Sequence, residues 1–217
     1  GGETAEHPGV MAEDEYDVSA TAVGVVEADE LLGPDRVRDG DVIIGMASSG
    51  LHSNGYSLAR HVLLEKAGLP LDGHIEELGR TLGEELLEPT RIYSLDCLAL
   101  AHECEVHTFC HVTGGGLVGN MERVIPDGKV AEMHRASWEP PQIFRTIRTV
   151  GKVPEAEMEK TFNMGVGMVA VVAPEDRDRA LAMLTARHVD CWELGVVRNA
   201  TAEDEGRRAT LVGTHVH

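Results

Sequence analysis

Two glycine-rich segments, each at an expected strand-to-helix transition, constrain this chain more than any other feature. Residues 48–58 read SSGLHSNGYSL, and residues 111–117 read HVTGGGL. Apolar runs precede both segments, and apolar residues at helical spacing follow them. Glycine allows a sharp turn and a close approach of the backbone to a ligand. A helix that begins at such a turn directs free N–H groups and its positive dipole end outward, which suits a phosphate group.

The residues around these turns leave two interpretations open. A glycine-rich turn is often only a turn, and Ser53 or Asn54 can cap the following helix instead of contacting a phosphate. Ser53 lacks the G-x-S-x-G context of a nucleophilic serine. Residue chemistry alone therefore predicts binding of a phosphorylated small molecule and goes no further.

Charge and hydropathy exclude several classes of partner. The formal net charge of −18 over 217 residues disfavours nucleic acid and anionic membrane surfaces as partners. No apolar run reaches the ~18 residues that a membrane span needs, and we see no signal peptide. The four cysteines form no C-x-x-C pair, so we interpret them as reduced, mostly buried thiols. These features predict a cytoplasmic protein.

The pattern of apolar residues predicts an α+β (α/β layered) fold, with helices packed on a mixed sheet that spans residues 34–217. We expect the residues Ile92, Leu95, Leu98 and Ala99 to point inward from the helix 90–104. The predicted helices are 54–67, 82–88, 90–104, 117–125, 141–150, 154–160 and 174–188. The predicted strands are 16–27, 41–47, 105–112, 130–133, 168–173, 191–197 and 209–212, the first of them outside the main sheet.

Histidine and acidic residues suggest metal ligation only weakly. His107 and His111 lie on the same expected strand, ~13 Å apart, which is too far to share one ion. Glu3 and Glu6 flank a tight loop, where they are either solvated surface residues or magnesium ligands beside a nucleotide. His215 and His217 are interpreted as residues of the chain end.

Five motifs then occur in a characteristic order. They are GGETAEHPG (1–9), GLHSNGYSL (50–58), EPTRIY (88–93), HVTGGG (111–116) and TFNMGVGM (161–168). In this order and spacing the chain closely resembles the phosphoribosylformylglycinamidine cyclo-ligase family, also called aminoimidazole ribonucleotide synthetases. The resemblance covers nearly the whole sequence and implies the C-terminal domain of that fold.

The resemblance implies an ATP-dependent, magnesium-dependent ligase of de novo purine biosynthesis. Its reaction closes the ring of formylglycinamidine ribonucleotide to give aminoimidazole ribonucleotide, through phosphorylation of the formyl oxygen. Family members carry an N-terminal domain with a phosphate-contacting DGVGTK stretch, which this sequence lacks. Residues 1–33 are therefore expected to be the end of an otherwise absent N-terminal ATP-binding and dimerisation domain. We expect the isolated chain to be inactive and the intact protein to be a homodimer.

Site residues follow from the motifs that match. Glu3 and His52 are the expected catalytic residues, Glu3 also being the expected magnesium ligand, and protonation of His52 near its ordinary pKa of ~6.5 would strengthen anion binding. Residues expected to contact substrate or phosphate are Gly50, His52, Ser53, Asn54, Gly55, Thr113, Gly114, Gly115, Gly116, Asn163 and Gly165.

Other functions remain open at this point. Thiamine-monophosphate kinase, selenophosphate synthetase and a hydrogenase-maturation dehydratase share the implied architecture. The dehydratase uses a C-terminal cysteine, whereas this chain ends THVH. The motifs EPTRIY and GLHSNGY favour the cyclo-ligase. A non-enzymatic interpretation, a ligand-binding half without activity of its own, also stands.

Overall fold

The computed structural model describes residues 20–215, and the chain separates into two units between Leu31 and Leu32. In the first unit, the described residues form no strand and only one 3-10 turn, Ala28–Glu30. The strand predicted over 16–27 is therefore wrong for residues 20–27, and residues 16–19 lie outside the described part. Val23 and Val25 are more than nine-tenths exposed. Valine content alone does not make a strand where no neighbouring strand pairs with it.

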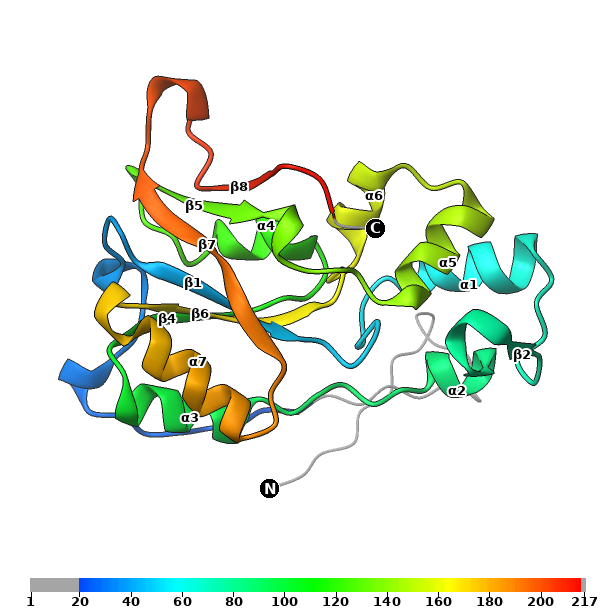
Figure 1. Cartoon of the computed structure of the whole chain (residues 1–217), viewed down its shortest axis with the longest axis horizontal. Coiled ribbons are helices and arrows are strands. Elements are labelled where there is room, and N and C mark those ends of the chain that lie inside the picture. Colours follow the sequence, from blue (N-terminus) through cyan, green and yellow to red (C-terminus); the bar gives the residue numbers. More distant parts are fainter. Residues whose placement is uncertain (1–19, 216–217) are drawn as a thin grey trace, which may run out of the picture. The chain divides into compact units, whose positions relative to one another are not determined.

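A six-stranded sheet forms the centre of the second unit (Figure 1). Its strand order is β4-β6-β1-β7-β5-β8, and every pairing is antiparallel except that of β5 with β8. The mixed sheet predicted from the sequence is thus confirmed. The strands of this sheet are β1 (Val42–Ala47), β4 (Val106–His111), β5 (Lys129–His134), β6 (Val166–Val172), β7 (Cys191–Asn199) and β8 (Ala209–Val212).

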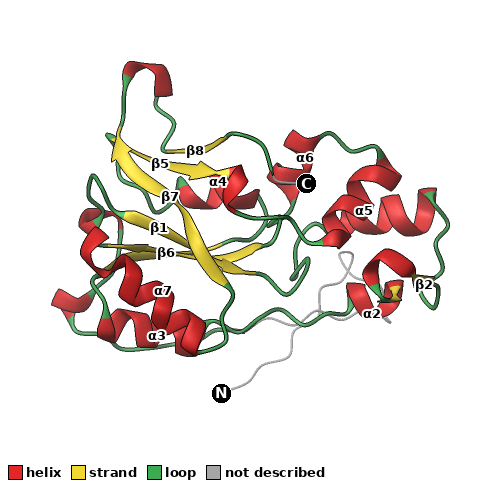
Figure 2. Cartoon of the chain, in the orientation of Figure 1, coloured by secondary structure: helices red, strands yellow, loops and turns green. Residues whose placement is uncertain are grey.

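Helices cover both faces of the sheet, as the red and yellow elements of Figure 2 show. Each helix predicted from the sequence is present, with shifted ends. The helices are α1 (Tyr56–Arg60), which continues as a π-helical turn (His61–Lys66), α2 (Leu82–Leu86), α3 (Ser94–Glu103), α4 (Gly116–Met121), α5 (Gln142–Gly151), α6 (Glu155–Thr161) and α7 (Arg177–Ala186). The short hairpin of β2 (His74–Ile75) and β3 (Arg80–Thr81) was not predicted from the sequence.

The two faces of β1 enter different parts of the core. Val42, Ile44 and Met46 pack with α3 and α7. Ile43 points to the other face, where it packs with α4 and with Ile125, which follows that helix. This alternation follows from the two-residue period of a strand. Because both faces are covered, the strand reads as a continuous apolar run instead of an alternating one. A third cluster, beside the sheet, joins α1, α2, α5 and α6.

Helix α3 turns a different side to the sheet than the sequence suggested. Ile92, Leu95 and Leu98 were expected to point inward, but they are 81%, 70% and 52% exposed. Tyr93, Leu100 and Cys104 face the core instead, with Cys97 packed against them. The segment carries two apolar stripes at helical spacing, and only one of them can pack against the sheet.

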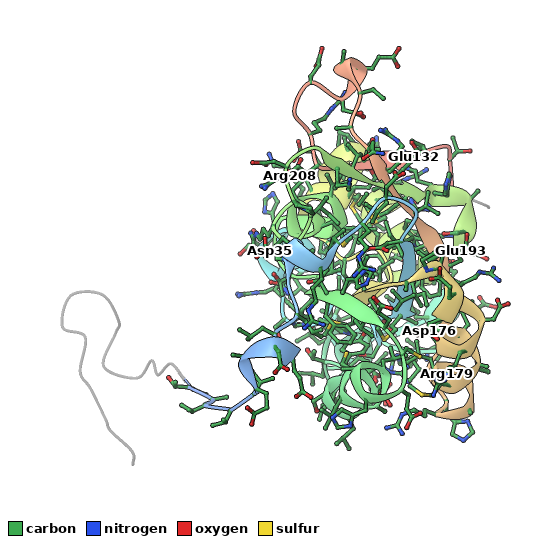
Figure 3. All side chains as sticks on the ribbon, turned by 90° about the vertical axis from the view of Figure 1, so that its left-hand side faces the viewer. Asp35, Glu132, Asp176, Arg179, Glu193 and Arg208 are labelled. Carbon is green, nitrogen blue, oxygen red and sulfur yellow. The ribbon has the colours of Figure 1, made fainter. Side chains whose placement is uncertain are left out.

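Ion pairs tie the outer helices together at the surface. Arg179 of α7 pairs with Glu103 of α3 at 2.6 Å, and Arg177 pairs with Glu193 of β7 at 2.5 Å. Asp176 accepts a hydrogen bond from the backbone of Glu105 at 2.6 Å. Figure 3 shows Asp176, Arg179 and Glu193 in this region, on and beside α7. Exposed pairs of this kind stabilise a fold only weakly, so the apolar core carries most of the stability.

Two further expectations concern membranes and thiols. Within residues 20–215, no helix combines the length and the apolar character that crossing a bilayer requires. All four cysteines are free thiols, of which Cys104 and Cys110 are buried. Burial raises the pKa of Cys110 to about 12, so this thiol is protonated at neutral pH.

The two stripes of α3 can be separated by mutation. Leu100→Ala should lower the free energy of unfolding by about 2–5 kcal/mol, because it leaves a cavity against the sheet. Leu95→Ala, on the exposed stripe, should change it by less than about 0.5 kcal/mol. Urea denaturation of both variants measures this, and a larger loss for Leu95→Ala would contradict the orientation of α3.

Candidate functional site

The direction of three strands brings the two glycine-rich turns to one edge of the sheet. Strand β6 lies between β1 and β4 and runs antiparallel to both, with Ala47 opposite Val166 and His111 opposite Met168. The last residues of β1 and β4 therefore meet at the start of β6. Two backbone bonds extend this arrangement into the loops, from Ser48 N to Gly165 O at 2.9 Å and from Val112 N to Gly167 O at 3.0 Å.

A side-chain hydrogen bond joins the two turns. The backbone N–H of Gly114 donates to Oδ1 of Asn54 at 3.0 Å. Residues sixty positions apart in the sequence are thereby held side by side. The two segments that the sequence suggested separately thus form one continuous surface.

Asn163 supports this surface from behind. Its Oδ1 accepts from Ser48 Oγ at 3.0 Å and from Gly165 N at 2.8 Å, while its Nδ2 donates to the carbonyls of Gly50 and Leu51 at 2.9 and 3.3 Å. The residue is only 2% exposed. Its carboxamide is engaged entirely within the protein, so it positions the turn and offers no free group to a ligand.

Asn120 plays the same part for the glycine triplet. Its Nδ2 donates to the carbonyls of Thr113, Gly114 and Gly116, at 3.2, 3.3 and 2.7 Å, and Thr113 Oγ1 donates to its Oδ1 at 3.1 Å. The sequence reasoning missed Asn120. A single polar residue on the buried side of a short apolar helix is the signal that identifies it.

The glycines of the triplet have different surroundings. Gly114 and Gly115 are exposed, and Gly115 has a φ of 98° that favours glycine. Gly116 is buried, with a φ of 69°, and a Cβ there would lie 1.7 Å from the carbonyl oxygen of Glu159 in α6. The backbone of Gly114 and Gly115 therefore faces solvent, whereas Gly116 allows close packing of two helices.

The first turn also divides into supporting and exposed residues. Gly55 has a φ of 77°, and a Cβ there would lie 2.3 Å from the ring of Phe162. Gly50 and Gly165 are buried. Helix α1 starts after Gly55 and has no side-chain cap, so the prediction that Ser53 or Asn54 caps it is wrong. Ser53 is exposed, with its Oγ 3.3 Å from Oγ1 of Thr90.

His52 lies beneath the surface that the two turns form. It is 4% exposed, has a left-handed φ of 56°, and accepts a hydrogen bond at Nε2 from Ser49 N at 3.1 Å. Its buried Nδ1 has no partner among the described residues. Burial, together with the nearby His111, lowers the pKa of His52 to about 4. The expectation that it titrates near ~6.5 is therefore wrong, and the ring is neutral at pH 7.

Tyr93 fills the space between His52 and His111. Its hydroxyl donates to the carbonyl of Ala47 at 2.7 Å, and its ring centroid lies 6.1 Å from that of His52 and 6.5 Å from that of His111. Burial raises the pKa of Tyr93, so the phenol stays protonated. Gly167 makes room for it, since a Cβ there would lie 2.0 Å from the Tyr93 oxygen. Both residues belong to the motifs quoted above, yet sequence reasoning assigned neither of them a role.

The metal ligand that the sequence predicted for this surface is Glu3. Glu3 lies outside the described residues. Within residues 20–215, the group of three or more possible ligands that the structure brings together is at α6 and involves none of the predicted site residues. The surface at the two turns thus offers exposed backbone, the Ser53 hydroxyl and the His111 ring, a set suited to an anion.

A layered α+β domain with two joined glycine-rich turns at one sheet edge is the class that this fold and site define. The family described as "AIR synthase related protein, C-terminal domain" matches residues 38–205. The chain belongs to this family.

Relatives support the same assignment. A phosphoribosylformylglycinamidine cyclo-ligase from Anaeromyxobacter sp. (strain Fw109-5) is 52% identical over 204 residues, which are 94% of this chain and 59% of that protein. A Streptomyces fradiae protein that carries this name provisionally is 59% identical over 176 residues, 81% of this chain and 97% of its own length. The chain thus spans almost the whole Streptomyces fradiae protein, but little more than half of the Anaeromyxobacter protein.

Solved structures share the fold at low sequence identity. Thiamine-monophosphate kinase from Stenotrophomonas maltophilia K279a has a TM-score of 0.58 at 17% identity, covering 88% of this chain and 56% of its own. The hydrogenase maturation protein HypE from E. coli has a TM-score of 0.53 at 17% identity, covering 84% and 49%. These similarities confirm the predicted fold and say nothing of the reaction.

The lowered pKa of His52 has a consequence for stability. Between about pH 6.5 and pH 4 the unfolded chain protonates this residue and the folded chain does not. Lowering the pH through this range therefore reduces the free energy of unfolding. His52→Asn, which tolerates the left-handed backbone, should lose less stability than the parent between pH 7 and pH 4.5.

Urea denaturation at both pH values measures this difference. The exposed His102→Asn is the matched control and should keep the parent's dependence on pH. An identical loss in His52→Asn and the parent would contradict the buried, neutral His52.

Proposed function

We propose that this chain is the substrate- and phosphate-binding part of an ATP-dependent cyclo-ligase that forms aminoimidazole ribonucleotide from formylglycinamidine ribonucleotide. The names of relatives 44–59% identical to it support this reaction. The hydrogen bond from Gly114 to Asn54 is the observation that carries the proposal. This bond joins two turns into one surface for an anion, whereas either glycine-rich turn alone would not indicate a binding site.

The residues present fit a phosphorylated ligand. The N–H of Gly114 is taken by Asn54, but Gly115 exposes backbone at a turn that only glycine readily forms, and Ser53 exposes a hydroxyl on the first turn. Backbone N–H groups attract an anion without a formal charge, which matters in a chain of net charge −18. Asn163 and Asn120 hold these turns in place, so a ligand would meet donors that are already oriented.

ATP, when bound, would supply the phosphoryl group that turns the formyl oxygen into a leaving group. The residues of this chain would bind and orient the phosphorylated substrate. His52 is neutral and accepts at Nε2, so its proton is on Nδ1, the buried atom without a partner. We assign His52 a positioning role that keeps the turn 49–52 in shape, in place of the catalytic protonation expected from the sequence.

The remaining parts of the proposal lie beyond the described residues. Magnesium would bind at Glu3 and at carboxylates of an N-terminal half like that of the longer relatives, and the intact enzyme would be a cytoplasmic homodimer. The described turns contribute no carboxylate group of their own to such a site. Thiamine-monophosphate kinase and selenophosphate synthetase remain less favoured alternatives, because the relatives' names agree on the cyclo-ligase.

The chain alone should form no aminoimidazole ribonucleotide. It spans 57–59% of several relatives, and residues 1–33 are expected to be only the end of their first domain. The test measures product from this polypeptide alone and after addition of the N-terminal portion of the Anaeromyxobacter relative. Activity restored by the addition supports the proposal. Turnover by the chain alone, close to that of a full-length relative, would refute the fragment interpretation.

Ser53 should contribute to substrate affinity. In the reconstituted enzyme, Ser53→Ala should weaken binding of formylglycinamidine ribonucleotide about tenfold or more, because a charge-assisted hydrogen bond is worth roughly 1.5–3 kcal/mol. Ser57→Ala, also exposed and one turn further along, is the matched control and should leave affinity unchanged. Equal affinities for the two variants would leave Ser53 without a role in binding.

A further inference from the structure

A second group of polar side chains lies at α6, apart from the residues assigned above. Glu155 and Glu159 are four residues apart, so both lie on one face of this helix. His215, from the segment after β8, completes the group. One ligand atom from each of the three residues lies within 4.8 Å of those of the other two.

Arg135 brings the C-terminal segment to this helix. Its Nε and one terminal nitrogen donate to the two carboxylate oxygens of Glu159, at 2.6 and 2.9 Å. Its other terminal nitrogen donates to the carbonyls of Leu211 and Gly213, at 2.8 and 3.2 Å. One guanidinium thus orients Glu159 and fixes the backbone two residues before His215.

His215 is buried without a satisfactory hydrogen bond. Its side chain is 4% exposed, and the edge of its ring packs against Trp138 with a centroid distance of 4.7 Å. Nε2 lies 3.5 Å from Oε1 of Glu159 but without hydrogen-bond geometry, and Nδ1 has no partner among the described residues. The imidazole lines a cavity of about 150 Å³ together with Glu155. A buried polar group without a partner is costly, so both nitrogens of this ring are available to a ligand. His215 lies near the chain end, as interpreted from the sequence, and the structure adds that its side chain is buried.

We propose that Glu155, Glu159 and His215 form a binding site for a divalent transition-metal ion of the zinc class. One imidazole nitrogen and two carboxylate oxygens are ligands that such ions accept, and the cavity leaves room for water in a further position. Arg135 orients the ligand Glu159 from outside the site. The three ligand atoms lie within 4.8 Å of one another, and the exposed side chain of Glu155 has room to turn toward an ion.

The arginines beside the cavity are already paired with carboxylates. Arg148 and Arg145 also line it, but Arg148 pairs with Glu155 at 3.8 Å and Arg145 pairs with Glu139. An anion would therefore have to compete with carboxylates that these arginines already contact. The ion pair between Arg148 and Glu155 is long and exposed, so a metal ion bound to Glu155 would displace Arg148 at little cost. Glu155 and Glu159 lie within residues 38–205, which the family comparison covers, and His215 lies beyond them.

Zinc binding to the full chain tests the proposal without any measurement of activity. After dialysis against a chelator, titration calorimetry with Zn²⁺ should give one ion per chain, and Mg²⁺ at the same concentration should not compete. Glu155→Gln and His215→Gln should each weaken binding at least tenfold. Since Glu155 is exposed, its substitution leaves the fold intact and keeps the test valid if the His215 variant is unstable.

Matched controls distinguish this site from surface binding. Glu157→Gln, on another face of α6, and the exposed His102→Gln should bind Zn²⁺ as the parent does. With Co²⁺ in place of Zn²⁺, the parent should show visible absorption that Glu155→Gln reduces. Unchanged affinity in Glu155→Gln, equal losses in the controls, or competition by Mg²⁺ would each overturn the proposal.

Discussion

The antiparallel pairing of β6 with both β1 and β4 is the constraint on which the rest of the structure depends. Because β6 runs against its two neighbours, the ends of β1 and β4 lie at the same sheet edge as the beginning of β6. Three loops that are far apart in the sequence must therefore meet there. Valine and alanine residues of β6 are buried on both faces, so this strand cannot shift its register without exposing core residues.

Three asparagine side chains convert this meeting of loops into a defined surface. Asn163 holds the first turn, Asn120 holds the glycine triplet, and Asn54 joins the two. A carboxamide can donate and accept at once, so one side chain satisfies several backbone groups that a turn leaves unpaired. The surface that results is mainly backbone. Under the proposed function, a strongly acidic chain would use this backbone to bind an anion without a cluster of lysine or arginine residues.

The sequence predicted much of this arrangement because its signals were local. Glycine runs after apolar strands identified the turns, and helical spacing identified each helix. The errors came from tertiary context. The segment of α3 offers two apolar stripes, Ile92–Leu95–Leu98 and Tyr93–Leu100, and spacing alone does not say which one the sheet covers. The burial of His52 and His215 was not predicted, because nothing local indicates that neighbouring elements cover them.

Asparagine roles were equally hidden from sequence reasoning. Asn163 was expected to face the ligand, but it faces the loop that it supports, and Asn120 attracted no attention within an ordinary helix. A motif residue can thus matter by shaping the site instead of touching the ligand. The distinction depends on which hydrogen bonds a side chain has already made, which only the folded arrangement reveals.

The most direct test of this account asks whether the two glycine-rich turns bind one ligand as a single surface. A ¹⁵N-resolved NMR titration of the chain with formylglycinamidine ribonucleotide follows the amides of Ser53, Asn54, Gly114 and Gly115 separately. The account predicts that all four amides shift together with one dissociation constant. Shifts confined to one turn, or shifts elsewhere with both turns unaffected, would contradict it.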